Sequence, residues 1–174
     1  MKNQECYTKD GKFLGWFSRS VSVVGLTFLK DNDDWFVLAS QRGEGTPDPE
    51  MVGKWNLVCG YLDFDETLKE AMIRETFEET GVDISNENIK MLSVNSDPKS
   101  DKRQNLTVRY LTVLKKNKKH YEEQFSHKHN EKDEVGKIRF INMSELDNYN
   151  WAFNHKELIE NCFKKLLNQK SNRK

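Results

Sequence analysis

Two runs rich in β-branched and aromatic residues lie early in the chain. Residues 20–30 (SVSVVGLTFLK) are predicted to form a buried strand, and residues 35–41 (WFVLASQ) the next one. The sequence DNDD between them is typical of a turn, so the two strands are expected to form a hairpin. Two glycines and two prolines indicate a loop at residues 43–49.

The remaining pattern predicts short strands and three helices. Strands are expected at residues 55–59, 90–94, 105–114 and 137–141. A first helix is expected from near Glu66 to Glu79 or Thr80, with Asp65 as its N-cap and Gly81 as its stop. A short helix should begin at Met143, and residues 155–167 have the apolar periodicity of an amphipathic closing helix. This order indicates an α/β fold, with a mixed sheet covered on both sides.

Composition narrows the class of protein. At 174 residues the chain is expected to be one domain over residues 1–174, with frayed ends at about 1–12 and 168–174. Twenty-eight basic and 28 acidic residues cancel, which argues against nucleic-acid and membrane partners. Three scattered cysteines match neither a disulfide framework nor a zinc site. Because no apolar run is long enough for a leader or a membrane span, we expect a cytoplasmic protein.

The candidate chemistry is concentrated in residues 60–82, GYLDFDETLKEAMIRETFEETGV. On a helix, Glu75, Glu78 and Glu79 share one face, because they stand at positions i, i+3 and i+4. Like charges so close repel one another, and Arg74 alone cannot neutralise them all. Hard divalent cations are the usual reason to gather carboxylate oxygens at one point.

This segment resembles the signature of the Nudix hydrolase (MutT-like) family, with the subfamily unresolved. The matching positions are Gly60, Glu66, Arg74, Glu75, Glu78, Glu79, Gly81 and Val82, and the one departure is Thr76 in place of an aliphatic residue. The resemblance implies an α/β/α sandwich with a central mixed β-sheet flanked by helices. It also implies metal-dependent hydrolysis of a pyrophosphate bond, with Mg²⁺ as the cofactor and Mn²⁺ as an alternative.

The resemblance also implies roles for individual residues. Glu75, Glu78 and Glu79 would hold the metal, and Glu75 is in addition a candidate general base. Arg74 would orient a catalytic glutamate and Glu66 would support the site, unless Glu66 simply pairs with Lys69 one turn on. A late carboxylate often completes such sites: Glu134 is favoured for its context before a strand, Glu131 is next, and Glu122, Glu123 and Asp133 complete the pool.

Other polar residues receive plainer interpretations. Glu70 lies outside the fixed positions of the signature and is interpreted as solvated. Cys59 stands where the family usually has a glycine, and we interpret it as a small buried filler rather than a nucleophile. His120, His127 and His129 lack the further ligands of a zinc site, so we interpret them as solvated loop residues.

The substrate is less sharply defined by the sequence. Arg42 and Arg109 are the chosen phosphate-binding candidates, with Arg19 and Lys54 also available; Trp16, Phe17, Trp55 and Trp151 are candidates for stacking a base. Residues 96–110 resemble a segment of Nudix enzymes acting on ADP-ribose-like dinucleotides, although Lys99 replaces an arginine. The expected substrate is a small nucleotide: a nucleoside diphosphate linked to another moiety, of ADP-ribose or dinucleotide type. Alternatives are a (deoxy)nucleoside triphosphate, an RNA 5′ end or a non-catalytic nucleotide-sensing module, and a homodimer is left open.

Overall fold

The computed structural model describes residues 2–100, 103–126 and 133–171. Within these residues seven strands form one mixed sheet, in the order β5-β4-β3-β8-β7, with β6 also paired to β3 and β9 to β4. The strands are β3 (Val21–Asp31), β4 (Asp34–Arg42), β5 (Trp55–Asn56), β6 (Cys59–Tyr61), β7 (Lys90–Asn95), β8 (Leu106–Leu114) and β9 (Val135–Asn142). The predicted mixed sheet is thereby confirmed.

Strand β3 is the centre of the sheet. It pairs antiparallel with β4 through the predicted hairpin, antiparallel with β6, and parallel with β8 from Val21↔Leu106 to Leu29↔Leu114. Because side chains alternate along a strand, Val23 and Leu29 enter one apolar cluster while Val24, Leu26 and Phe28 enter the other. A strand buried on both faces explains the near-continuous apolar run that predicted it.

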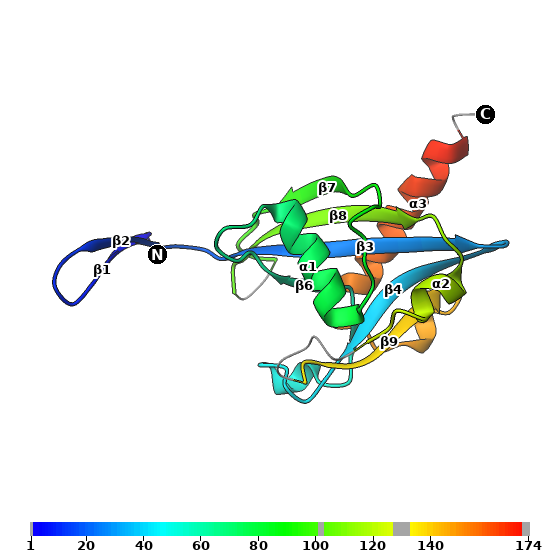
Figure 1. Cartoon of the computed structure of the whole chain (residues 1–174), viewed down its shortest axis with the longest axis horizontal. Helices are drawn as coiled ribbons and strands as arrows, with labels where there is room; N and C mark the ends of the chain where they lie inside the picture. Colours follow the sequence, from blue (N-terminus) through cyan, green and yellow to red (C-terminus); the bar gives the residue numbers. More distant parts are fainter. Residues whose placement is uncertain (1, 101–102, 127–132, 172–174) are drawn as a thin grey trace.

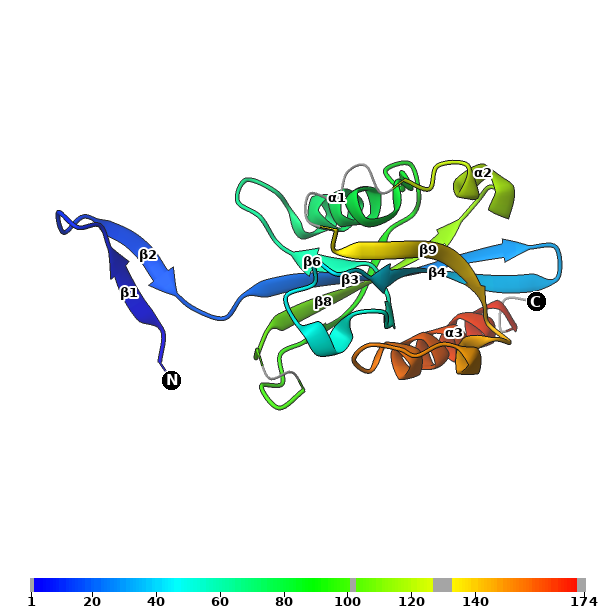
Figure 2. The ribbon, with the colours of Figure 1, turned by 90° about the horizontal axis from the view of Figure 1, so that it is seen from below.

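The two long helices cover opposite faces of the sheet (Figures 1 and 2). Helix α1 (Leu68–Thr80) buries Ala71 and Met72 in the first cluster. Helix α3 (His155–Ser171) buries Ile159, Cys162 and Leu166 in the second. The sandwich of helix, mixed sheet and helix is therefore as expected. No helix in the described part of the chain combines the length and apolar content needed to cross a bilayer.

The predicted start of α1 is wrong by two residues. Asp65 has a φ of 65° and does not cap; instead the Thr67 hydroxyl accepts the Glu70 N–H, and the Glu70 carboxylate accepts the Thr67 N–H at 2.8 Å. This capping box places Glu66 just outside the helix. It also gives the exposed Glu70 a structural contact that the solvated interpretation missed. The stop at Gly81 is confirmed: its φ is 77°, and its N–H binds the Phe77 carbonyl at 2.7 Å.

Other boundaries differ from the sequence-based expectation. Regular structure lies within both ends that were expected to fray: β1 (Gln4–Tyr7) and β2 (Phe13–Phe17) form an antiparallel hairpin, and α3 continues past residue 168 to Ser171. The single strand expected at 55–59 is divided into β5 and β6. The short helix η2 (Leu146–Asn148) begins three residues later than expected, and neither α2 (Lys118–Glu122) nor η1 (Pro49–Met51) was predicted.

Candidate active site

Arg74 is the centre of the acidic cluster, which comprises Glu66, Glu75, Glu78 and Glu79. Its Nε and Nη2 donate to the two carboxylate oxygens of Glu66 at 3.0 and 2.7 Å. Its Nη1 donates to Glu75 and Glu78, each at 2.9 Å. The hydrogen bond from Arg74 is the main reason why the pKa of Glu66 is lowered. One planar guanidinium thus ties three carboxylates together, and the alternative pairing of Glu66 with Lys69 does not occur.

Glu79 turns away from Arg74 and towards the sheet. One carboxylate oxygen accepts the Ser40 hydroxyl at 2.7 Å, and the other accepts the Cys59 N–H at 3.1 Å. Although both hydrogen bonds favour the ionised form, burial raises the pKa of Glu79 to about 8. A carboxyl group held in this way binds a proton readily unless a positive charge lies nearby.

Glu75 lies directly against the backbone of β6. A Cβ atom at Gly60 would stand 2.0 Å from the carboxyl carbon of Glu75, so only glycine leaves room for that carboxylate. Burial raises the pKa of Glu75 to about 7, and the neighbouring Arg74 opposes the rise. The glycine and glutamate of the signature are therefore coupled by direct contact.

The chemistry of this donor set suits a hard divalent cation. Two partly buried carboxyl groups with raised pKa values lie on one face of α1, and a bound cation would favour their ionised forms. In the arrangement seen here, however, the described residues contain no group of three acidic, histidine or cysteine side chains placed to hold a metal ion. Glu75 and Glu78 contact Arg74 while Glu79 contacts Ser40, so the expected convergence on one point is not present.

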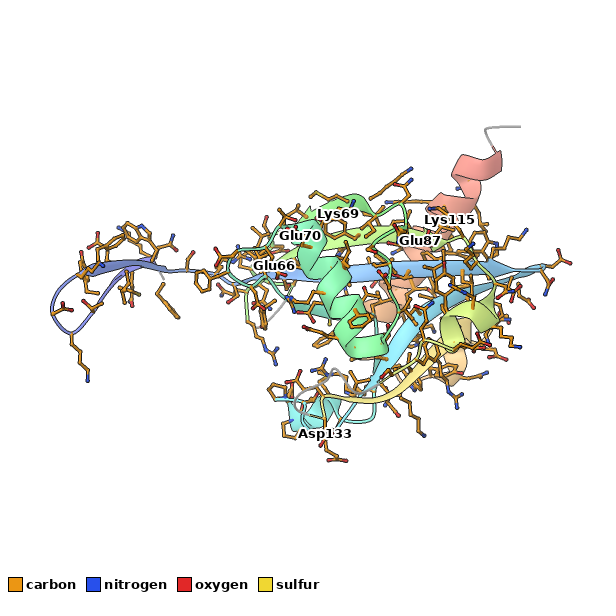
Figure 3. The ribbon with its side chains drawn as sticks, in the orientation of Figure 1. Glu66, Lys69, Glu70, Glu87, Lys115 and Asp133 are labelled. Atoms are coloured by element: carbon orange, nitrogen blue, oxygen red, sulfur yellow. The ribbon has the colours of Figure 1, made fainter. Side chains whose placement is uncertain are left out.

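The late carboxylates are distributed over two regions. The carbonyl of Glu134 accepts the Gly43 N–H at 2.7 Å, which places this residue beside the β4–β5 loop. Its neighbour Asp133 is exposed and lies away from Glu66 (Figure 3). Glu122 is the last residue of α2 and Glu123 its C-cap, and they pair with Lys118 and Lys119 one turn earlier. Glu131, His127 and His129 lie outside the described residues, whereas His120 is exposed on α2.

A second group, which we call the basic cluster, consists of Arg42, Arg109 and His155. The Nε atoms of both arginines are buried, and neither has a hydrogen-bond partner in the described part of the chain. His155 is buried, and its Nδ1 accepts the Leu57 N–H at 3.0 Å. Burial, followed by the charges of Arg42 and Arg109, lowers the pKa of His155 to about 3, so the imidazole is neutral at physiological pH. From the sequence, His155 was expected only as the first residue of the closing helix. No motif around it indicates that it belongs to a functional site.

Most of the other binding candidates have structural contacts. Arg19 donates to the carbonyls of Ser96, Gln104 and Asn105 and so holds the loop before β8. Trp55 is buried in the second apolar cluster, and Trp151 packs against that cluster. Trp16 and Phe17 are exposed on the β1–β2 hairpin, and Lys54 contacts the Met51 sulfur.

Cys59 is partly buried rather than buried, and it packs against the second apolar cluster. Burial, aided by the negative charge of Glu79, raises the pKa of the Cys59 thiol to about 12. A thiol that stays protonated at neutral pH is a poor nucleophile.

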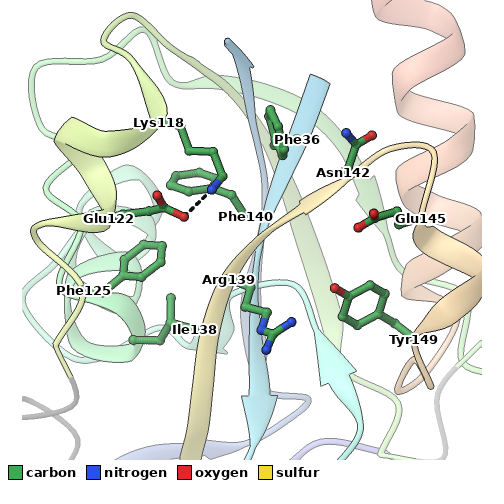
Figure 4. Close-up of a pocket in the computed structure, with 10 residues that line it drawn as sticks. All are labelled: Phe36, Lys118, Glu122, Phe125, Ile138, Arg139, Phe140, Asn142, Glu145 and Tyr149. Atoms are coloured by element: carbon green, nitrogen blue, oxygen red, sulfur yellow. Dashed lines mark hydrogen bonds and ion pairs between the residues drawn. The ribbon is translucent and has the colours of Figure 1, made fainter. Parts of the chain in front are cut away.

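One pocket in the described part of the protein lies apart from this chemistry. It has a volume of about 530 Å³ and is lined by Phe36, Phe125, Arg139 and Tyr149 among others, on the β9 side of the sheet (Figure 4). None of the signature residues lines it. A smaller pocket, of about 360 Å³, is lined by Arg42, Gly43 and Asp133 together with their neighbours. We place the candidate site by its buried charges rather than by pocket size, because the larger pocket contains neither the acidic nor the basic cluster.

Comparison with known proteins agrees with this geometry. The profile of the NUDIX domain family matches residues 18–162. The NUDIX domain of Shewanella oneidensis NrtR, solved in complex with ADP ribose, is 21% identical with a TM-score of 0.65, over 86% of this chain and 90% of that one. A MutT/nudix family protein from Enterococcus faecalis is 23% identical with a TM-score of 0.69, over 91% and 66%. A mutT/nudix family protein from Listeria innocua is 19% identical with a TM-score of 0.61, over 86% and 95%.

A search among curated protein sequences found no match. At these identities the solved structures establish the fold, while the profile match over most of the chain establishes the family. The chain therefore belongs to the NUDIX domain family.

Proposed function

We propose that this protein hydrolyses the pyrophosphate bond of a nucleoside diphosphate linked to another moiety, with Mg²⁺ as its cation and Mn²⁺ as a substitute. The observation that carries the proposal is the contact of Glu75 with Gly60, beside a Glu79 carboxylate fixed by Ser40 and Cys59. Support for an ADP-ribose-like substrate comes from the NrtR NUDIX domain, whose structure was solved with ADP ribose. The family generally uses divalent metal cations.

Four carboxylates are the proposed ligands of the cation: Glu75, Glu78, Glu79 and Glu134. When bound, the cation would neutralise phosphate oxygens and make a water molecule more acidic. Arg74 keeps Glu66 and Glu75 in place through its hydrogen bonds. Glu75 is also the candidate general base, because a bound cation would favour its ionised carboxylate, which can accept a proton from the attacking water.

The positive side of the site is assigned to Arg42 and Arg109. Their guanidinium Nε atoms are buried and find no acceptor in the described part of the protein, and phosphate oxygens would provide those acceptors. Arg42 also acts electrostatically on Glu79 and Cys59, so the basic cluster lies near the acidic one. We therefore expect the substrate phosphates to lie between the two clusters.

The test is turnover with Mg²⁺ by wild type, Glu79→Gln and the control Glu157→Gln, which changes an exposed residue of α3. Replacing a residue that only supports a metal ligand typically lowers activity about 10- to 100-fold. Replacing a ligand itself should lower it at least as much, so we expect Glu79→Gln to lower kcat/KM about 100-fold or more. The Glu157→Gln variant should match wild type. Near-wild-type activity of Glu79→Gln would overturn the assigned role.

A substrate panel separates the proposal from its alternatives. Water adds across the P–O–P bond, so ADP-ribose should yield AMP and ribose 5-phosphate, whereas a nucleoside triphosphate or an RNA 5′ end would release pyrophosphate. We expect AMP release from ADP-ribose to be the faster reaction. Ligand binding without any turnover under Mg²⁺ or Mn²⁺ would instead indicate a nucleotide-sensing module.

A further inference from the structure

Three nitrogen donor groups lie near one another on the α3 side of the sheet, and the described part of the chain provides no acceptor for them. The Nε atoms of Arg42 and Arg109 have no hydrogen-bond partner among residues 2–100, 103–126 and 133–171. Since Nδ1 of His155 accepts the Leu57 N–H, its proton resides on Nε2, for which the described residues provide no acceptor. By contrast, Arg74 forms ion pairs with four carboxylates, and Arg19 donates to three carbonyls. The two buried arginine donors are costly to leave unpaired, and an anion with several oxygens would satisfy them together with the histidine N–H.

An unusual aromatic side chain borders the basic cluster. Phe153 is 51% exposed, and its φ of 55° is in the left-handed region, which a bulky residue rarely adopts. Its ring centroid is 5.2 Å from that of His155 and 5.8 Å from the guanidinium carbon of Arg42. Such backbone strain persists where the surrounding structure holds it, and it is a reason to ask what the residue does.

The segment that includes β5 and β6 links this corner to the acidic cluster. The Leu57 N–H binds His155 on the α3 side, and two residues later the Cys59 N–H binds Glu79 on the α1 side. Val24 of β3 pairs with Cys59 of β6 on one side and with Arg109 of β8 on the other. Arg109 is therefore one strand away from Cys59. A ligand seated at Phe153 and the basic cluster is therefore beside the reactive carboxylates.

We propose that Phe153 is the stacking surface for the nucleobase of a nucleoside phosphate whose phosphate oxygens bind the basic cluster. The ligand class is a planar base joined through its sugar to a phosphate. The biological meaning of this site depends on the proposed function. The site itself is a binding site, so it is tested by ligand binding without any turnover. A half-exposed ring beside unpaired cations suits such a ligand, since every base offers a face for stacking and its phosphate is an anion.

The experiment compares the binding of AMP and ribose 5-phosphate, which differ only by the base, in calorimetry without metal. For wild type we expect AMP to bind about tenfold or more tightly than ribose 5-phosphate, as one base stack implies. Phe153→Leu should remove most of this ratio and Phe153→Tyr should keep it. The matched control is Phe13→Leu, which changes a ring of similar exposure, 50%, on the distant hairpin and should keep the ratio.

Arg109→Gln separates the phosphate part of the proposal from the base part. We expect this variant to weaken AMP and ribose 5-phosphate by a similar factor, because both carry the phosphate. A wild-type protein that binds the two ligands equally, or a Phe153→Leu variant that keeps the wild-type ratio, would overturn the proposal. If AMP binds as expected but no pyrophosphate substrate is turned over, the proposed function fails while this inference stands.

Discussion

At the scale of single residues, the buried carboxyl groups of α1 give the protein a pH-dependent stability. The pKa of Glu79 rises from an ordinary 4.5 to about 8 on folding, and that of Glu75 to about 7. The folded protein therefore binds these protons more tightly than the unfolded chain, so stability falls as pH rises towards about 8 and is level above it. His155 has the opposite sign, because its lowered pKa costs stability only as pH falls below about 6.5.

Between pH 6.5 and 8 the stability thus depends on the carboxyl groups without a contribution from His155. We expect the free energy of unfolding of the metal-free protein to fall across this pH range by at most about 2 kcal/mol per carboxyl. Glu79→Gln should flatten part of the slope, and Mg²⁺ should do the same by favouring the ionised forms. Thermal unfolding in EDTA and in Mg²⁺, with Glu157→Gln as the control, measures this. A stability that rises between pH 6.5 and 8 would contradict the burial argument.

The sequence could identify the acidic cluster because the spacing of its glutamates is itself the geometry of a helix face. It could not identify their partners, since Ser40 and Cys59 approach Glu79 only through the folded sheet. Nor could it separate the cap from its neighbours: Asp65, Glu66 and Thr67 are all polar, and the choice depends on backbone angles. His155 and Phe153 were missed because the features that mark them, the charge of Arg42 near His155 and its guanidinium over the Phe153 ring, arise only in the folded chain.

At the scale of elements, the capping box at the start of α1 fixes where the acidic cluster begins. Thr67 and Glu70 each accept the other's backbone N–H, and Glu66 precedes this box (Figure 3). We expect Thr67→Ala to lower the free energy of unfolding by about 1 kcal/mol and to lower kcat as Glu66 loosens. Denaturant unfolding checks the first effect and steady-state kinetics the second.

The control for the cap is Lys69→Ala, which changes an exposed residue in the same turn. It should alter stability by less than about 0.5 kcal/mol. Thr67→Ser should restore both stability and kcat, because serine also caps. Equal behaviour of Thr67→Ala and Lys69→Ala would show that the cap contributes nothing to the site.

The predictions succeeded for long elements whose burial leaves a regular sequence pattern. A strand buried on both faces gives a continuous apolar run, and a helix buried on one face gives a regular spacing of apolar residues. The bounds of β3, β4 and β8 differ from the expected ones by about one residue at each end. Helix α2 has five residues, three of them Lys or His, and so presents no apolar period. The hairpin β1–β2 was missed because its aromatic residues are exposed and therefore follow no core-facing alternation.

At the scale of the whole molecule, that hairpin extends away from the body of the protein (Figure 1). It precedes the segment matched by the NUDIX profile and exposes Tyr7, Phe13, Leu14, Trp16 and Phe17, each at least 50%. An isolated two-stranded hairpin is at best marginally stable in water. The last strand in the sheet order, β7, is also uncovered, with Met91, Leu92 and Val94 exposed.

These two apolar surfaces lead us to expect a homodimer in which the hairpin of each copy covers β7 of the other. Half-exposed large side chains contribute roughly 100 Å² each, so the eight residues amount to about 800 Å² per copy. A twofold pair would then bury about 1,600 Å², the size of a standard stable interface. The measurement is the mass in solution, where wild type should run at twice the 20.5 kDa of one chain.

Trp16→Glu in the hairpin and Leu92→Lys in β7 should each produce a folded monomer, because each places a charge in the expected contact. The control is Phe64→Glu, since Phe64 is 98% exposed in the loop before α1 and belongs to neither surface. A wild-type monomer at tens of micromolar would exclude the pairing. Dimers that survive Trp16→Glu but not Leu92→Lys would show that β7 pairs with itself, because only a surface inside the contact is sensitive to a new charge.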